Sequence, residues 1–192
     1  MSENYFIMIA DSPWAGPTVK VIDKPDVDAT DGEFIGGVSK PYRVDLVTDP
    51  RVLPTENFPP RDIHEASGFK LFSRKFITIL EGLGVSNIEY LPAEVTDVRS
   101  AQKVDYSVAN ILGRLNALDE DESDFMFSSS GKLMGVNSIV FDEKKIEGHK
   151  IFMLGEIPLL IVAHKSIKEA VEEHGLTGFV FLAEDEYEPG MI

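Results

Sequence analysis

The segment FKLFSRKFITILEGLGVSNIEYLP, residues 69–92, decides how the rest of the chain is expected to fold. Its large apolar side chains recur at helical spacing, which predicts that they lie on one face of a helix. They are Phe69, Phe72, Phe76, Ile79, Leu80 and Leu83. Ser73 is expected to cap this helix by accepting a hydrogen bond from a first-turn amide. Gly82 and Gly84 are expected to end it, because glycine adopts the left-handed conformation at little cost.

A strand is predicted directly after this helix. Residues Asn87 to Leu91 alternate between polar and apolar, which is the period of a strand, and Pro92 is expected to end it. A helix with a wholly apolar face is not stable alone in water, so it must pack on a sheet. The strand that follows it is the first candidate for that sheet.

Several short segments of the chain carry a resemblance to a known family. They are residues 71–76 (LFSRKF), 80–92 (LEGLGVSNIEYLP), 106–112 (YSVANIL), 115–119 (LNALD) with Ser123, 139–142 (IVFD), 151–152 (IF) and 175–181 (GLTGFVF). In this order they resemble the signature of the Imm-eleven family of immunity proteins from bacterial polymorphic toxin systems. The resemblance implies a protein that is not an enzyme and that binds a cognate toxin domain and blocks it.

The sequence predicts an α+β fold in a single domain, residues 1–192. A mostly antiparallel or mixed β-sheet of at least six strands would pack against two main helices, near residues 73–82 and 166–174. Residues 69–182 form the core of the resemblance. Residues 1–62 match it only loosely, and they are rich in loops because eight of the eleven prolines lie in the first sixty residues.

Composition narrows the class of protein. The chain has 192 residues, 43% of them hydrophobic, with no cysteine and no apolar run long enough to span a membrane. The N-terminus lacks the basic region of a signal peptide, so we expect a cytoplasmic protein. The net charge of −15 argues against nucleic acid as a partner. It is compatible either with solubility alone or with a basic protein partner.

Strands are predicted at Asn4–Ala10 and Tyr42–Val47 in the N-terminal part. Trp14 is expected to cover the edge of the core, or else to be an exposed interface anchor. Asp26–Glu33 has some features of a calcium loop, but Gly37 stands where the closing glutamate is required. We therefore interpret that segment as a solvated turn and expect no metal site.

The densest acidic run is Asp119–Asp124. Because so many charges cannot be buried together, the run is expected at the surface, before a hairpin formed by residues 125–127 and 133–136. We predict that it forms part of a toxin-binding patch, with these candidates: Glu120, Asp121, Glu122 and Asp124. Asp119 matches the family segment, and a capping or buried hydrogen-bonding role is expected for it instead.

The C-terminal part combines predicted strands with the second helix. Ser166 and Glu169 have the spacing of a capping box, and Ile167, Ala170 and Val171 would form the buried stripe. Gly175 is expected to end the helix. The predicted strands are residues 138–142, 151–154, 159–163 and 178–182, of which 159–163 is apolar throughout and so expected to be buried on both faces.

No pattern in the sequence indicates a catalytic, metal or cofactor site. The histidines, His64, His149, His164 and His174, lack the spacing of metal ligands, and there is no nucleophile elbow or phosphate loop. His174 is expected to interact with the negative end of a helix dipole. Two alternatives to the immunity function remain open. One is a hydrolase whose active site assembles from distant residues, and the other is a structural protein that self-associates.

Overall fold

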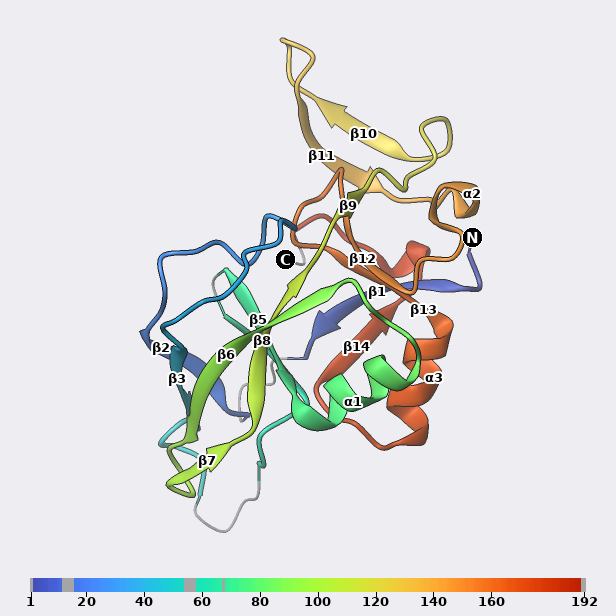
Figure 1. Cartoon of the computed structure of the whole chain (residues 1–192). Coiled ribbons are helices and arrows are strands. Elements are labelled where there is room, and N and C mark those ends of the chain that lie inside the picture. Colours follow the sequence, from blue (N-terminus) through green and yellow to red (C-terminus); the bar gives the residue numbers. More distant parts are fainter. Residues whose placement is uncertain (1, 12–15, 54–57, 67, 191–192) are drawn as a thin grey trace.

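The computed structural model describes residues 2–11, 16–53, 58–66 and 68–190. Trp14, for which the sequence allows two interpretations, lies outside the described residues. The first sheet has five strands (Figure 1), of which β9 is parallel to β12 and the other neighbours are antiparallel. In spatial order they are β14 (Phe179–Leu182), β1 (Tyr5–Ala10), β13 (Ile161–His164), β12 (Ile151–Leu154) and β9 (Arg114–Leu115).

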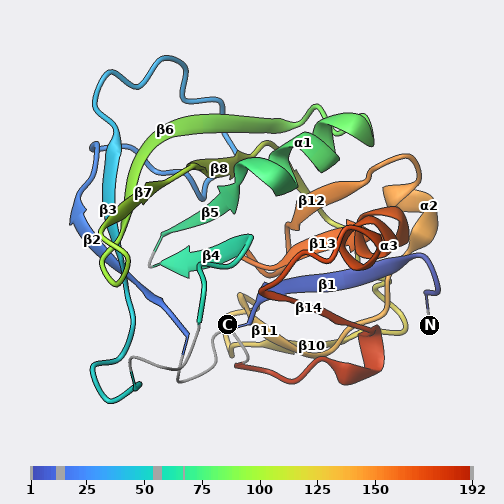
Figure 2. The ribbon, with the colours of Figure 1, turned by 90° about the horizontal axis from the view of Figure 1, so that it is seen from below.

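The second sheet has seven strands and is strongly curved (Figure 2). Their order is β2 (Thr18–Asp23), β3 (Tyr42–Val47), β6 (Ile88–Asp97), β8 (Tyr106–Ile111), β5 (Phe69–Ser73) and β4 (Ile63–Ala66), with β7 (Gln102–Val104) also paired to β6. Only β3 and β6 run parallel. The strands at the two ends of this order, β2 and β4, contact each other, so the sheet approaches a closed barrel.

Three helices and a separate hairpin complete the described part of the chain. The helices are α1 (Arg74–Gly82), α2 (Glu143–Ile146) and α3 (Lys165–Glu173), and α1 lies beside α3. The hairpin is formed by β10 (Asp124–Phe127) and β11 (Leu133–Ser138), and a short 3-10 turn, η1, covers Glu184–Glu186. The α+β class with mixed sheets is confirmed, although the strands divide into two sheets and a hairpin rather than forming one sheet.

Helix α1 begins later than the predicted apolar stripe implies. Ser73 is its cap, as predicted, and the Ser73 hydroxyl accepts a hydrogen bond from the N–H of Phe76. Phe69 and Phe72 are not on the helix but on strand β5. Their separation of three places them on opposite faces of the sheet, where they enter different parts of the core. The buried face of the helix consists of Phe76, Ile77 and Leu80.

The end of α1 follows the sequence. Gly84 has a positive φ of 76°, and the N–H of Gly84 donates to the carbonyl of Glu81, while that of Val85 donates to Leu80. This is the glycine-stopped helix end that was predicted. Pro92, however, does not end the next strand, because β6 continues to Asp97. The pairing of β6 with β3 starts at Ala93, one residue after Pro92. Proline has no N–H, but at this position no hydrogen bond to β3 is lost.

Three apolar clusters form the core. The central cluster takes side chains from both sheets and from α1 and α3. In it the ring of Phe76 contacts Phe72 of the curved sheet and Phe179 of the five-stranded sheet, with ring centroids 4.9 and 4.6 Å apart. A second cluster covers the opposite face of the five-stranded sheet. The third fills the concave side of the curved sheet.

The C-terminal part contains three departures from prediction. The cap of α3 is His164, whose Nδ1 accepts from the N–H of Ser166, so Ser166 lies inside the helix and forms no capping box. Strand β13 reaches His164 directly before the helix and so fixes the cap there. Leu159 was predicted to begin a strand, but it lies outside β13, with a φ of 91° and an exposed side chain. Of the strand predicted at 138–142, only the end of β11 and a single bridge at Phe141 are present. Gly175, with a φ of 59°, ends α3 as predicted.

The aromatic contact between the sheets gives the first prediction. Phe76→Ala is expected to lower the free energy of unfolding by about 3–5 kcal/mol, because it leaves a cavity in the central cluster. Ser166→Ala is the matched control and is expected to cost less than about 0.5 kcal/mol, since His164 provides the cap. Urea titrations of both variants measure the difference. A Phe76 variant as stable as the Ser166 variant would contradict this packing.

His64 gives a prediction about pH. It is buried, and its Nε2 accepts a hydrogen bond from the N–H of Arg61 at 3.1 Å, which requires the neutral ring. Burial, together with the charge of Arg61, lowers the pKa of His64 from 6.5 to about 4. The unfolded chain therefore binds a proton first as the pH falls below 6.5, and this favours unfolding.

The expected loss of stability from this group between pH 7 and pH 5 is about 2 kcal/mol. His64→Gln is expected to remove most of that slope, and urea titrations at several pH values in this range measure it. An equal slope in the variant and the wild type would show that His64 does not titrate as proposed.

Candidate functional site

The hairpin β10–β11 projects from the body of the protein (Figure 1). Its two strands pair with each other and belong to neither large sheet. A two-stranded hairpin is only marginally stable alone, so it needs support from the core. That support comes from its base, where Val136 is 2% exposed and Phe125 packs against the second cluster. The outer part of the hairpin is therefore held on a firm base.

The acidic turn, residues 119–124, directly precedes β10. Asp119 organises it, because its Oδ1 accepts from the N–H groups of Asp121 and Glu122 at 2.9 and 3.1 Å. Its own carbonyl accepts from the N–H of Ser123, and its N–H donates to the carbonyl of Val140. The capping role predicted for Asp119 is confirmed.

Ser123 fixes the other end of the acidic turn. Its side chain is buried, and its hydroxyl donates to the carbonyl of Val140 and accepts from the N–H of the same residue. The turn is thus attached to the chain segment leading to Phe141 at both of its ends. The side chains between the two anchors face solvent.

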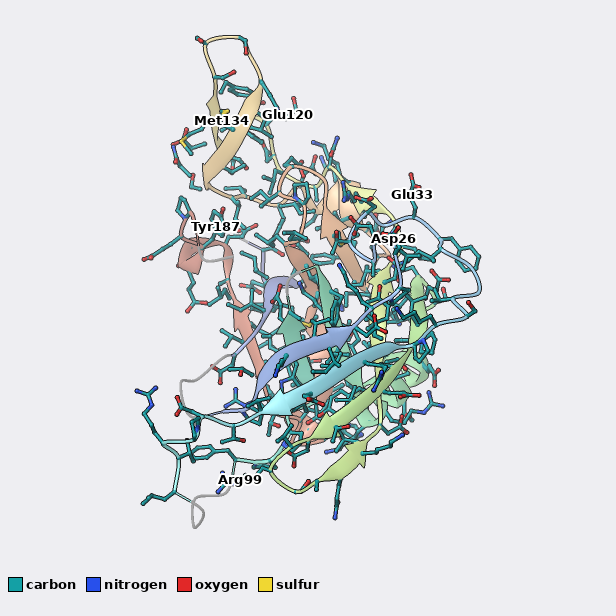
Figure 3. The ribbon with its side chains drawn as sticks, turned by 90° about the vertical axis from the view of Figure 1, so that its left-hand side faces the viewer. Asp26, Glu33, Arg99, Glu120, Met134 and Tyr187 are labelled. Atoms are coloured by element: carbon teal, nitrogen blue, oxygen red, sulfur yellow. The ribbon has the colours of Figure 1, made fainter. Side chains whose placement is uncertain are left out.

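All four predicted site residues are exposed: Glu120, Asp121, Glu122 and Asp124. Figure 3 shows Glu120 near the hairpin, away from the sheets. Glu120 lies 3.9 Å from the ammonium of Lys145, and the Asp124 carboxylate accepts from the amide of Asn137 at 3.0 Å. The structure brings these residues together in one short segment, with carboxylates that remain available to a partner.

The sequence interpretation missed the apolar part of this surface. Met126, Phe127 and Met134 on the hairpin are 41, 62 and 67% exposed. The rings of Phe125 and Phe127 stack with centroids 6.2 Å apart, which holds Phe127 in place. Successive side chains of a strand point to opposite faces, so three consecutive apolar residues place at least one on each face. Residues 125–127 are such a run. If only one face of the hairpin is covered, at least one of these apolar side chains must be exposed. Exposed apolar groups gathered on one element are typical of an interaction surface.

The histidines make contacts that support the fold. In addition to His64 and His164, the ring of His174 donates to the carbonyl of Ala170 at the end of α3, and His149 packs edge-on against Phe152. Within residues 2–11, 16–53, 58–66 and 68–190, no three acidic or histidine side chains converge where they could hold a metal ion. In the segment Asp26–Glu33, which has some features of a calcium loop, the Asp28 carboxylate accepts hydrogen bonds from the N–H and hydroxyl of Thr30. This is the pattern of a solvated turn.

The anchors of the acidic turn give a prediction. Asp119→Ala is expected to lower the free energy of unfolding by about 1–2 kcal/mol, because two N–H groups lose their acceptor. Asp121→Ala is the matched control and is expected to change it by less than about 0.5 kcal/mol. Urea titration measures both, and equal effects would show that Asp119 does not organise the turn.

Comparison with known proteins gives a family match. Residues 10–185 match the immunity protein family Imm11. No curated protein matches the chain. No helix in the described ranges is long and apolar enough to cross a membrane. The match covers nearly the whole chain, including the acidic turn, the hairpin and every strand but β1, of which it reaches only Ala10, and the chain therefore belongs to the Imm11 immunity protein family.

Proposed function

We propose that the protein binds and neutralises a cognate toxin of a bacterial polymorphic toxin system, using the acidic turn and the hairpin β10–β11 as its recognition surface. Membership of an immunity protein family supports a binding function rather than catalysis. The observation that carries the choice of surface is the acidic turn: its backbone is anchored by Asp119 and Ser123 while its other carboxylates face solvent.

The two parts of the recognition surface have different roles. Exposed carboxylates attract a basic partner from a distance, which speeds association and makes it sensitive to salt. Exposed apolar side chains such as Phe127 and Met134 lose contact with water only in the complex, so they slow dissociation. An acidic approach surface beside apolar anchors suits a toxin whose active site is basic.

The partner we infer is a toxin domain of the nuclease type, with a basic substrate site that the acidic turn covers. The net charge of −15 supports such a partner and disfavours nucleic acid itself. The complex would form in the cytoplasm, where a nuclease toxin finds its substrate. No cofactor or metal ion is needed for this function, since binding alone blocks the toxin.

A hydrolase is the alternative from the sequence, and the structure offers it little support. A pocket between the two sheets carries the polar residues Glu65 and Lys70, but these pair with each other at 2.8 Å. Neither histidine nor serine is among the described lining residues, and the ion pair engages the one carboxylate of the lining that could act as a base.

The test is binding to the toxin domain encoded beside this protein, with protection of cells that express the toxin. Reversing two charges, Asp121→Lys with Glu122→Lys, is expected to slow association about tenfold at low salt, with the effect fading as salt screens the charges. Glu172→Lys with Glu173→Lys on α3 is the control for net charge, since both side chains are exposed there. Stopped-flow or surface-based kinetics measure the rates.

A second pair of variants tests the apolar part. Phe127→Ala with Met134→Ala is expected to speed dissociation at least tenfold with little change in association, whereas Val98→Ala, an exposed residue elsewhere, should change neither rate. Unchanged rates in the charge and apolar variants would reject this recognition surface. Absence of binding by the wild type would reject the proposed function itself.

A further inference from the structure

A pocket of about 490 Å³ opens between the two sheets. Its walls come from β1 and β13 on one side and from β4, β5 and β8 on the other, so it lies at the junction of the two sheets. Ile9, Phe69, Ile111 and Ile161 are among its apolar lining residues. None of the residues of the recognition surface belongs to this lining, so the pocket is a separate feature.

Small residues keep this pocket open. Ala10, Ala29, Ala66, Gly68 and Ala109 all line it, and they come from four different parts of the chain. Ala10 and Ala66 are only half-buried, so their methyl groups border open space. Larger apolar residues at these positions would fill the space and add buried apolar surface. The hollow therefore has the size and polarity to hold an apolar side chain.

The rim of the pocket carries charge of two kinds. On the β4–β5 side the ammonium of Lys70, whose side chain is 11% exposed, pairs with Glu65 at 2.8 Å, so this side is neutral. On the other side a second hollow shares Thr30 and Gly68 with the pocket, and Asp26 and Asp28 line it with Lys24. Both aspartates are exposed. With two aspartates beside one lysine, this side of the rim is acidic overall.

These aspartates belong to the strap, residues 24–41, which connects β2 to β3 (Figure 3 labels Asp26 and Glu33 on it). Glu89 of β6 holds the strap, because its carboxylate accepts from the N–H groups of Ile35 and Gly36 at 2.9 and 2.7 Å. Burial raises the pKa of Glu89, but these two N–H groups and the amide of Asn110 outweigh it, so the pKa is lowered overall.

Further polar contacts hold the strap closer to the pocket. Arg114 donates to the carbonyl of Thr30 at 2.9 Å, and the N–H of Gly113 donates to the carbonyl of Gly32. Asn110 donates to the carbonyl of Glu33 at 2.8 Å. The acidic rim is therefore held in position before any partner binds, which reduces the entropy cost of binding.

We propose that this pocket receives an apolar side chain of the toxin, flanked by a lysine or arginine of the toxin that pairs with Asp26 and Asp28. This second contact rests on the proposed function and adds an anchor away from the hairpin. Charge complementarity selects this occupant. A second copy of this chain, with a net charge of −15, would bring acidic surface against acidic surface. A small ligand would need free polar groups in the lining to orient it, but Glu65 and Lys70 pair with each other.

The test fills the pocket. Ala66→Leu and Ala10→Leu each place a larger side chain in the hollow, and both are expected to speed dissociation of the toxin at least tenfold with little change in association. Ala93→Leu is the matched control, because Ala93 is also half-buried in a strand but does not line the pocket. Melting temperatures of the free proteins confirm that all three variants fold.

The charged rim is tested separately. Asp26→Lys is expected to slow association at low salt more than Glu172→Lys, which changes the net charge equally on α3. Toxin bound with wild-type rates by folded Ala66→Leu and Ala10→Leu overturns the pocket proposal and leaves the proposed function standing, whereas a wild type that binds no toxin removes both.

Two other results also overturn it. A small molecule seen in native mass spectra of the wild type and lost from Ala66→Leu would make the pocket a ligand site. A dimer in sedimentation experiments that Ala66→Leu dissociates would make it a contact between copies.

Discussion

The contact on which the rest of the structure depends is the aromatic packing of Phe72, Phe76 and Phe179. Phe72 belongs to the curved sheet, Phe179 to the five-stranded sheet, and Phe76 to the helix between them. Through this contact one short helix joins two sheets that share no strand. The hairpin and the pocket both depend on that junction. The first rises from the outer face of the five-stranded sheet, and the second lies where the two sheets meet.

Local signals predicted local structure well. The cap at Ser73, the glycine-stopped end of α1 and the central strands all follow from patterns within a few residues. Errors arose where tertiary context decided between local options. Phe69 and Phe72 have helical spacing, but both lie on strand β5. Ser166 has the spacing of a helix cap, but β13 ends at His164, and His164 is the cap. Nor could the sequence show that the strands form two sheets, since this division depends on pairing between distant segments.

The candidate site divides in the same way. The exposure of Asp121 and the organising role of Asp119 follow from charge density and capping chemistry, both local properties. The pocket could not be predicted, because Ala10, Ala66 and Ala109 are far apart in sequence and unremarkable alone. Their significance appears only when the two sheets bring them together. The strap is an intermediate case. Its acids are evident in the sequence, but its anchor on Glu89 is not.

The acidic turn has a consequence for how such a protein can change over time. Its shape depends on the side chains of Asp119 and Ser123 and on backbone N–H groups. The side chains at residues 120–122 contribute nothing comparable to that shape. On the proposed function, substitutions there would alter what the surface recognises while leaving folding almost unaffected. If the turn recognises a toxin as proposed, a lineage could follow a toxin that is itself diverging, one substitution at a time, without passing through unstable intermediates.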